Sequence, residues 1–99
     1  MSHQAKMILQ AFLDTPSERR YGYELRQITG LTTGTMYPLL DRLCREGWLR
    51  DSWEEIDERT EGRRRRRYYI LTADGKRASR EAVGSHGPAL RALRVGWST

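Results

Sequence analysis

Two short helical patterns, separated by only a few residues, constrain the fold of this chain more than any other feature. In the first pattern Tyr21, Leu25 and Ile28 share one helical face, and Gly30 is a natural stop. The second pattern carries its apolar stripe at Met36, Leu39, Leu40 and Leu43. Two short helices joined through a glycine-containing turn have the layout of a helix-turn-helix.

The second of these helices is expected to begin between Thr33 and Thr35 and to end at Gly47. Pro38 fits a helix only near its start, because proline lacks an N–H donor and its ring clashes with the preceding turn. A hydroxyl of Thr33 or Thr35 is expected to cap the free amides of the first turn. The outward side of the helix is polar and carries Thr33, Thr35, Tyr37, Asp41, Arg42 and Arg45.

A β-hairpin is predicted after these helices. Residues 48–54 and 68–72 are rich in aromatic and β-compatible residues, and a polar stretch over residues 55–67 separates them. A hairpin that directly follows a helix-turn-helix forms a wing. The predicted fold class is therefore mainly α with a small β-hairpin, a winged helix-turn-helix plus a C-terminal helix.

Two further helices complete the predicted fold. An apolar stripe over residues 4–13 predicts the first helix of the chain. Thr72 is expected to cap a C-terminal helix over residues 73–83. Because Gly84, Gly87 and Pro88 interrupt that pattern, we divide the chain into a winged-helix domain, residues 1–83, and an interrupted tail, residues 84–99.

Several functional classes are disfavoured. No apolar run approaches the roughly 18 residues of a membrane span, and the amino terminus lacks the layout of a signal peptide, so a cytoplasmic location and no membrane partner are expected. The single cysteine, Cys44, and two distant histidines predict neither an internal disulfide nor a metal site. No nucleophile motif or phosphate-binding loop is present, so we expect neither enzymatic activity nor a cofactor.

The net charge of +5 favours acidic partners. Arginine, rather than lysine, supplies nearly all of the 18 basic residues. Its planar group makes bidentate contacts to phosphate and guanine, which favours nucleic acid as the partner. A GC-rich genome would also raise the arginine content, so the composition alone leaves this question open.

Residues 5–80 resemble PadR-family transcriptional regulators through an ordered series of motifs. The motifs are YGYEL (21–25), TGL (29–31), GTMYPLL (34–40), RL (42–43), GWL (47–49), WE (53–54) and YYILT (68–72), together with Gly62 and Gly75. The resemblance implies a winged helix that reads DNA through its third helix, and a C-terminal helix that builds a dimer. It also implies that aromatic residues near the dimer interface, such as Trp97 here, can bind a small aromatic effector.

Three departures from the family pattern stand out. Arg64 replaces a frequent proline, which should loosen the wing and add a charge. Cys44 stands where an acidic residue is common, and we interpret it as neutral to function. The interruption from Gly84 to Pro88 shortens the C-terminal helix, so a weaker dimer than is usual for the family is expected.

The candidate DNA-binding residues lie in two places. Helix N-terminal amides and hydroxyls bind phosphate oxygens, and a helix fits the major groove. The run of five arginines adds charge to the wing, where the residues nearest the loop tip are better placed than Arg67, which begins a strand. The predicted contacts are Thr33, Gly34, Thr35, Tyr37, Arg42, Arg63, Arg64 and Arg65.

The predicted function is that of a sequence-specific double-stranded DNA-binding regulator, a repressor acting as a homodimer on an inverted-repeat operator. The apolar residues Val83, Leu90 and Leu93 are the predicted dimerisation residues. Two alternatives stay open: a winged helix that binds duplex RNA by shape, and a protein-interaction module that has lost DNA binding.

Overall fold

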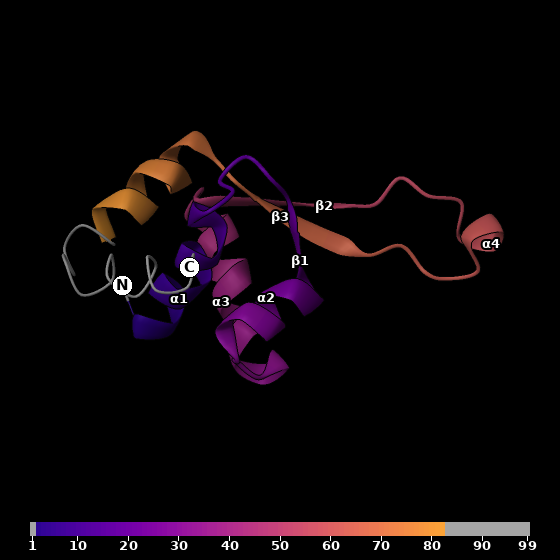
Figure 1. Cartoon of the computed structure of the whole chain (residues 1–99), viewed down its shortest axis with the longest axis horizontal. Coiled ribbons are helices and arrows are strands. Elements are labelled where there is room, and N and C mark those ends of the chain that lie inside the picture. Colours follow the sequence, from indigo (N-terminus) through magenta and orange to yellow (C-terminus); the bar gives the residue numbers. More distant parts are fainter. Residues whose placement is uncertain (1, 83–99) are drawn as a thin grey trace.

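The computed structural model describes residues 2–82, in which three helices pack against a small sheet that extends into a long wing (Figure 1). The labelled elements are α1 (His3–Leu13), β1 (Arg20–Tyr21), α2 (Gly22–Thr29), α3 (Thr33–Arg45), β2 (Leu49–Trp53), α4 (Glu58–Glu61) and β3 (Arg67–Leu71). A further helix follows from residue 73 and is described to residue 82. The winged helix-turn-helix predicted from the sequence is confirmed.

The core lies between α1, α2, α3 and the base of the sheet. Its fully buried members come from every one of these elements: Ile8, Leu9, Phe12, Leu25, Met36, Leu40, Leu43, Leu49, Tyr69 and Leu71. Leu39, predicted in the same stripe, is only partly buried. The predicted inward position of Ile28 is wrong, since this residue is 45% exposed. Thr29 is buried instead, and its hydroxyl donates to the carbonyl of Leu25 at 2.6 Å.

Helix α3 begins at Thr33, as predicted, but its cap differs from the prediction. The N-cap residue is Thr32, which has extended backbone angles, whereas Thr33 and Thr35 already lie within the helix. A capping residue must stand outside the helix, so neither Thr33 nor Thr35 can take this role. The hydroxyl of Thr35 instead accepts a hydrogen bond from the Thr32 hydroxyl at 3.2 Å.

The sheet has three strands rather than the two of the predicted hairpin. Strand β3 is central and pairs antiparallel with β2 on one side and β1 on the other. Strand β1 contains only Arg20 and Tyr21, which lie opposite Tyr69 and Tyr68. Two residues are too few to give an alternating pattern, so the sequence offered no signal for this strand.

The wing ends in a short helix that the sequence analysis treated as polar loop. Helix α4 sits at the far end of the wing in Figure 1. Asp57 caps it, because its carboxylate accepts from the Arg59 amide at 3.0 Å and from the Thr60 hydroxyl at 2.9 Å. Gly62 ends it with a φ of 70°, a left-handed conformation that glycine adopts without strain.

The C-terminal helix is held against the start of the wing by a glycine. Thr72 caps this helix as predicted, since its hydroxyl accepts from the Gly75 amide at 2.9 Å. A Cβ atom on Gly75 would lie 1.9 Å from the carbonyl oxygen of Trp48. The helix can therefore approach the chain this closely only because residue 75 has no side chain. Among residues 2–82, no helix has the length and apolar character needed to cross a membrane.

Replacing Gly75 by alanine should destabilise the domain by about 1–3 kcal/mol, the usual cost of overpacking. Gly34→Ala is the matched control, because no atom lies within 4 Å of the Cβ it would add in α3. That change should stabilise the domain by about 0.5–1 kcal/mol through helix propensity. Urea denaturation of both variants measures the two effects, and equal shifts would contradict the close approach at residue 75.

Candidate nucleic-acid interface

The first turns of α3 present small polar groups to the surrounding solvent. Thr33, Gly34 and Thr35 are all exposed. The first turn contains no acidic residue that would repel an anion. Free amides and the positive end of the helix dipole therefore stand beside two hydroxyls, an arrangement suited to phosphate or base edges.

Tyr37 lies at the junction of α2 and α3. A Cβ atom on Gly22 would come within 2.4 Å of the Tyr37 hydroxyl oxygen, so glycine at this position is what allows the ring to rest there. The ring stays 37% exposed. Its position depends on the packing between the two helices, and it faces solvent on the same helix as the two threonines.

Arg42 lies farther along α3, where it pairs with Glu46 at 3.3 Å. Its side chain is 66% exposed. Ion pairs this exposed contribute little to stability, because water and salt screen them. Arg42 could therefore leave Glu46 and bind a phosphate at little cost in free energy.

The five consecutive arginines of the wing, residues 63–67, fall into two groups. Arg63 binds Glu54, Arg66 lies over the ring of Tyr23 at 5.3 Å, and Arg67 binds Asp51 at 2.6 Å. The side chains of Arg64 and Arg65 are exposed, and their guanidinium groups make no hydrogen bond or ion pair within residues 2–82. Of these five identical residues, three therefore contact an acidic or aromatic side chain through their guanidinium groups, and two do not.

Glu54 is the centre of the contacts at the root of the wing. Its residue is 8% exposed, and its carboxylate accepts from the Arg63 guanidinium at 2.7 and 3.1 Å. It also accepts from the Arg66 amide at 2.8 Å and from the Tyr21 hydroxyl at 3.3 Å. The hydrogen bond from Arg63 is the main reason why the pKa of Glu54 falls from 4.5 to about 2, against the opposing effect of burial.

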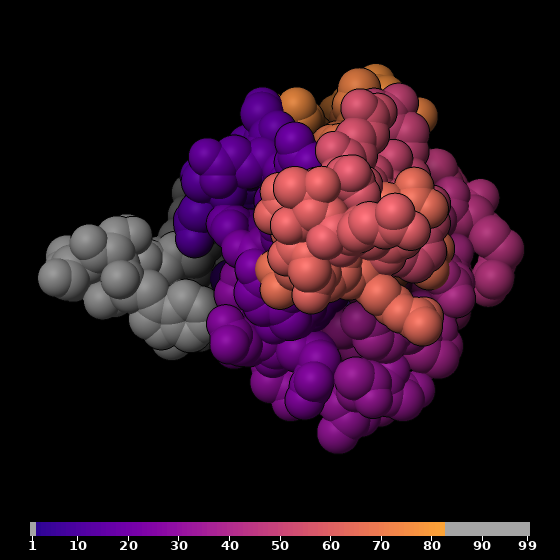
Figure 2. Space-filling view, turned by 90° about the vertical axis from the view of Figure 1, so that its right-hand side faces the viewer, coloured from indigo at the N-terminus to yellow at the C-terminus, as the bar shows by residue number. Residues whose placement is uncertain are grey.

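Arg67, the first residue of β3, links the wing to the helix-turn-helix. Besides Asp51 on β2, its guanidinium approaches Asp41 of α3 at 3.5 Å. The wing is thus linked to α3 through Arg67 and to β1 through Glu54. Figure 2 looks onto the wing tip, which projects in salmon in front of the purple and magenta helices of the helix-turn-helix.

Aromatic rings join the wing to the start of α2. Tyr21 and Tyr23 stack at 5.7 Å, and Tyr68 meets Tyr21 edge-on at 6.1 Å. Arg19 covers Tyr68 at 4.5 Å. The predicted place of Tyr21 on the face of a helix is wrong, since this residue lies in β1 and precedes α2. No role was predicted for Tyr23, although the YGY motif places the two rings close together in the chain.

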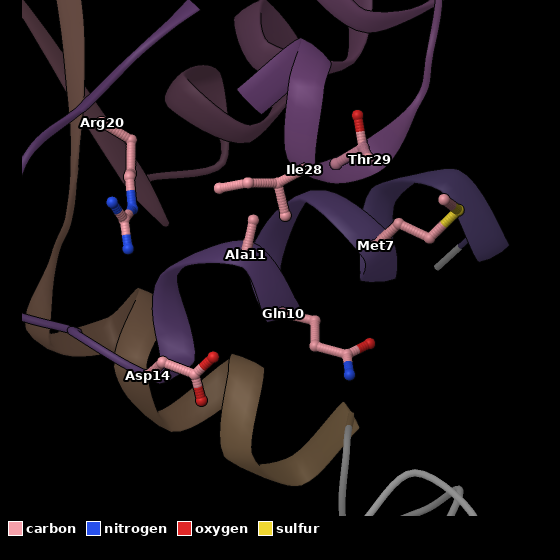
Figure 3. Close-up of a pocket in the computed structure, with 7 residues that line it drawn as sticks. All are labelled: Met7, Gln10, Ala11, Asp14, Arg20, Ile28 and Thr29. Carbon is pink, nitrogen blue, oxygen red and sulfur yellow. The ribbon is translucent and has the colours of Figure 1, made fainter. Parts of the chain in front are cut away.

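A separate groove runs between α1 and α2, with a volume of about 290 Å³. Its lining residues are Met7, Gln10, Ala11, Asp14, Arg20, Ile28 and Thr29, and Figure 3 shows Ile28 facing Ala11 across it. The exposed Ile28 gives the groove an apolar wall. The described part of the chain contains no group of three or more residues able to hold a metal ion.

The comparison with family models gives a match over residues 11–81 to the transcriptional regulator PadR-like family. The chain belongs to this family. The match includes α2, α3, the wing and most of the described C-terminal helix. A search of curated protein sequences gives no significant match.

Several solved structures share the fold of this chain. A PadR-family transcription regulator from Clostridium difficile has a TM-score of 0.70 and 22% identity, with 99% of this chain and 100% of that one covered. A PadR-family regulator from Eggerthella lenta has a TM-score of 0.64 and 26% identity, covering 94% and 81%. The BpsR protein of Bordetella bronchiseptica, whose DNA binding is regulated by 6-hydroxynicotinic acid, has a TM-score of 0.71 and 19% identity, covering 98% and 71%.

The contacts of Glu54 predict a pH dependence of stability. Because the pKa of Glu54 is lowered in the folded state to about 2, its contribution is complete above about pH 4.5 and is lost as the pH falls toward 2. The free energies of unfolding of the wild type and of Glu54→Gln should therefore differ at pH 7 and converge between pH 4.5 and 2. A difference that stays constant over this range would contradict the lowered pKa.

Proposed function

We propose that this PadR-family regulator binds double-stranded DNA in a sequence-specific way and acts as a repressor. In the proposed complex, α3 enters the major groove and the wing lies along the adjacent phosphate backbone. Two observations together support this most: the N-terminus of α3 is exposed and bears hydroxyls, and the guanidinium groups of Arg64 and Arg65 on the wing make no hydrogen bond or ion pair within residues 2–82. The activity is one of binding, without a catalytic step or a cofactor.

The proposed contacts divide by their chemistry. Thr33, Gly34 and Thr35 offer hydroxyl and amide donors to the backbone and to base edges. Tyr37 and Arg42 extend the surface along the same helix. On the wing, Arg64 and Arg65 provide charges for phosphates, while Arg63 is bound to Glu54.

Duplex DNA fits this surface better than the alternative partners. The major groove of A-form RNA is too deep and narrow for side chains to read, so α3 would lose its contacts there. A protein-interaction surface would favour apolar or acidic residues on the outward face of α3. That face instead carries Thr33, Thr35 and Arg42. A competition between duplex DNA and duplex RNA of equal length separates these partners.

Binding should depend steeply on salt, because each phosphate neutralised by an arginine releases counterions. Arg64→Ala should lower the slope of log affinity against log salt by about 0.9, the value of one phosphate contact. Arg80→Ala removes the same charge from the exposed side of the C-terminal helix and should leave the slope nearly unchanged. Equal effects of the two changes would place the wing outside the interface.

We also propose that the regulator acts as a homodimer. A single recognition helix covers too few base pairs to find one operator among many competing sites. The predicted dimerisation residues Val83, Leu90 and Leu93 lie outside the described residues. The dimer is therefore supported by this need for discrimination and by the family resemblance.

A dimer with two-fold symmetry requires an inverted-repeat operator whose half-sites lie roughly 34–36 Å apart, or a multiple of that. Sedimentation should give a dimer at micromolar concentration. The double change Leu90→Asp with Leu93→Asp should give a monomer that still binds a single half-site. A wild-type protein that remains monomeric on its selected operator would contradict the proposal.

A small aromatic effector and a cytoplasmic location complete the proposal. The regulation of BpsR by 6-hydroxynicotinic acid supports an effector of this class. The groove between α1 and α2 is one place to look for it, since Met7, Ala11 and Ile28 provide apolar walls. Titration with aromatic acids, monitored by protection of the selected DNA site, tests this part of the proposal.

A further inference from the structure

We propose that Arg63 is a positioning residue, which holds the wing in place through Glu54, and that Arg64 and Arg65 make the phosphate contacts of the wing. The inference rests on the proposed function. It revises the sequence-based prediction, in which Arg63, Arg64 and Arg65 were equivalent DNA contacts.

The guanidinium of Arg63 is already occupied. Its two terminal nitrogens donate to the two carboxylate oxygens of Glu54, at 2.7 and 3.1 Å. One of them also donates to the carbonyl of Arg64 at 3.2 Å. The Arg63 side chain is 33% exposed, and the Glu54 side chain is 10% exposed. A phosphate would therefore have to displace a bidentate, largely shielded partner.

Glu54 joins three parts of the molecule at one carboxylate. It follows β2 directly, and its amide donates to the carbonyl of Arg66 at 3.0 Å, which continues the pairing of the two wing strands. Its carboxylate accepts from Tyr21 of β1, immediately before α2, and from the Arg66 amide. Removing Arg63 would leave this carboxylate without its charged partner in a shielded position, which is costly.

This anchoring determines where the free arginines lie. The Arg65 amide donates to the Glu58 carboxylate at 2.9 Å, while the Arg66 amide is held by Glu54. The backbone of residues 63–66 is thus attached both to the tip helix and to the wing root. The side chains of Arg64 and Arg65 project from a fixed segment, so they lose less conformational entropy when they bind phosphate.

Glu54→Gln distinguishes positioning from direct contact by the sign of its effect. The change removes a negative charge from a DNA-binding wing and frees Arg63. If Arg63 bound phosphate, affinity for DNA would therefore rise. If Arg63 positions the wing, affinity should fall by about three- to tenfold, as expected when charge-assisted hydrogen bonds are lost.

Lysine at position 63 provides the second test. Arg63→Lys keeps a positive charge for phosphate but loses the planar fork that fits the Glu54 carboxylate. We expect Arg63→Lys to weaken DNA binding nearly as much as Arg63→Ala, whereas Arg64→Lys should keep most of the affinity that Arg64→Ala loses. The double variant Glu54→Gln with Arg63→Ala should be no weaker than either single variant, because both changes break the same contact.

The experiment measures the affinity of these variants for one selected duplex, with thermal unfolding as the control that the helical body stays folded. Trypsin cleavage of the wing is measured on the free protein, and Glu54→Gln should be cut faster than the wild type. Tighter binding by Glu54→Gln, or additive losses in the double variant, would overturn the inference. A wild-type chain that binds no duplex would overturn the proposed function itself, while faster cleavage would still support the hold of Glu54 on the wing.

Discussion

The arrangement of the wing depends on a shielded carboxylate at its root. Glu54 accepts hydrogen bonds from Arg63, Arg66 and Tyr21, which belong to the wing and to the strand before α2. The opposite strand is attached to α3 by Arg67 through Asp41. Charge-assisted bonds with little exposure to water are stronger than surface pairs. The contacts of Glu54 are therefore the stronger ones, and the partly exposed pair of Arg67 and Asp41 adds a link between the wing and α3.

The helices could be predicted from the spacing of apolar residues, because the buried face of a helix recurs every three to four residues. Met36, Leu40 and Leu43 recur at helical spacing and are all buried. The prediction failed where a helix is too short for its apolar residues to define one face. In α2, Thr29 rather than Ile28 is buried. The Thr29 hydroxyl can be buried because it donates a hydrogen bond to the Leu25 carbonyl, one turn earlier in the helix.

The interface was harder to predict than the fold, because its geometry depends on contacts between distant residues. Nothing local distinguishes Arg63 from Arg64, yet one is bound to Glu54 and the other is free. The acidic partners of Arg67 lie on two other elements, β2 and α3. The run of arginines is visible in the sequence, but the contacts of each arginine are set only when the strands pair and bring those carboxylates close.

The acidic composition of the wing tip limits how the wing can meet DNA. Asp57, Glu58 and Glu61 lie in and beside α4 at the far end of the wing, where they outnumber the one basic residue of that helix, Arg59. Phosphates repel these carboxylates, so insertion of the tip into a groove is electrostatically unfavourable. In the proposed complex the duplex therefore meets the side of the wing that carries Arg64 and Arg65. In that complex, the contacts of Glu54 at the wing root would keep this side turned toward the DNA.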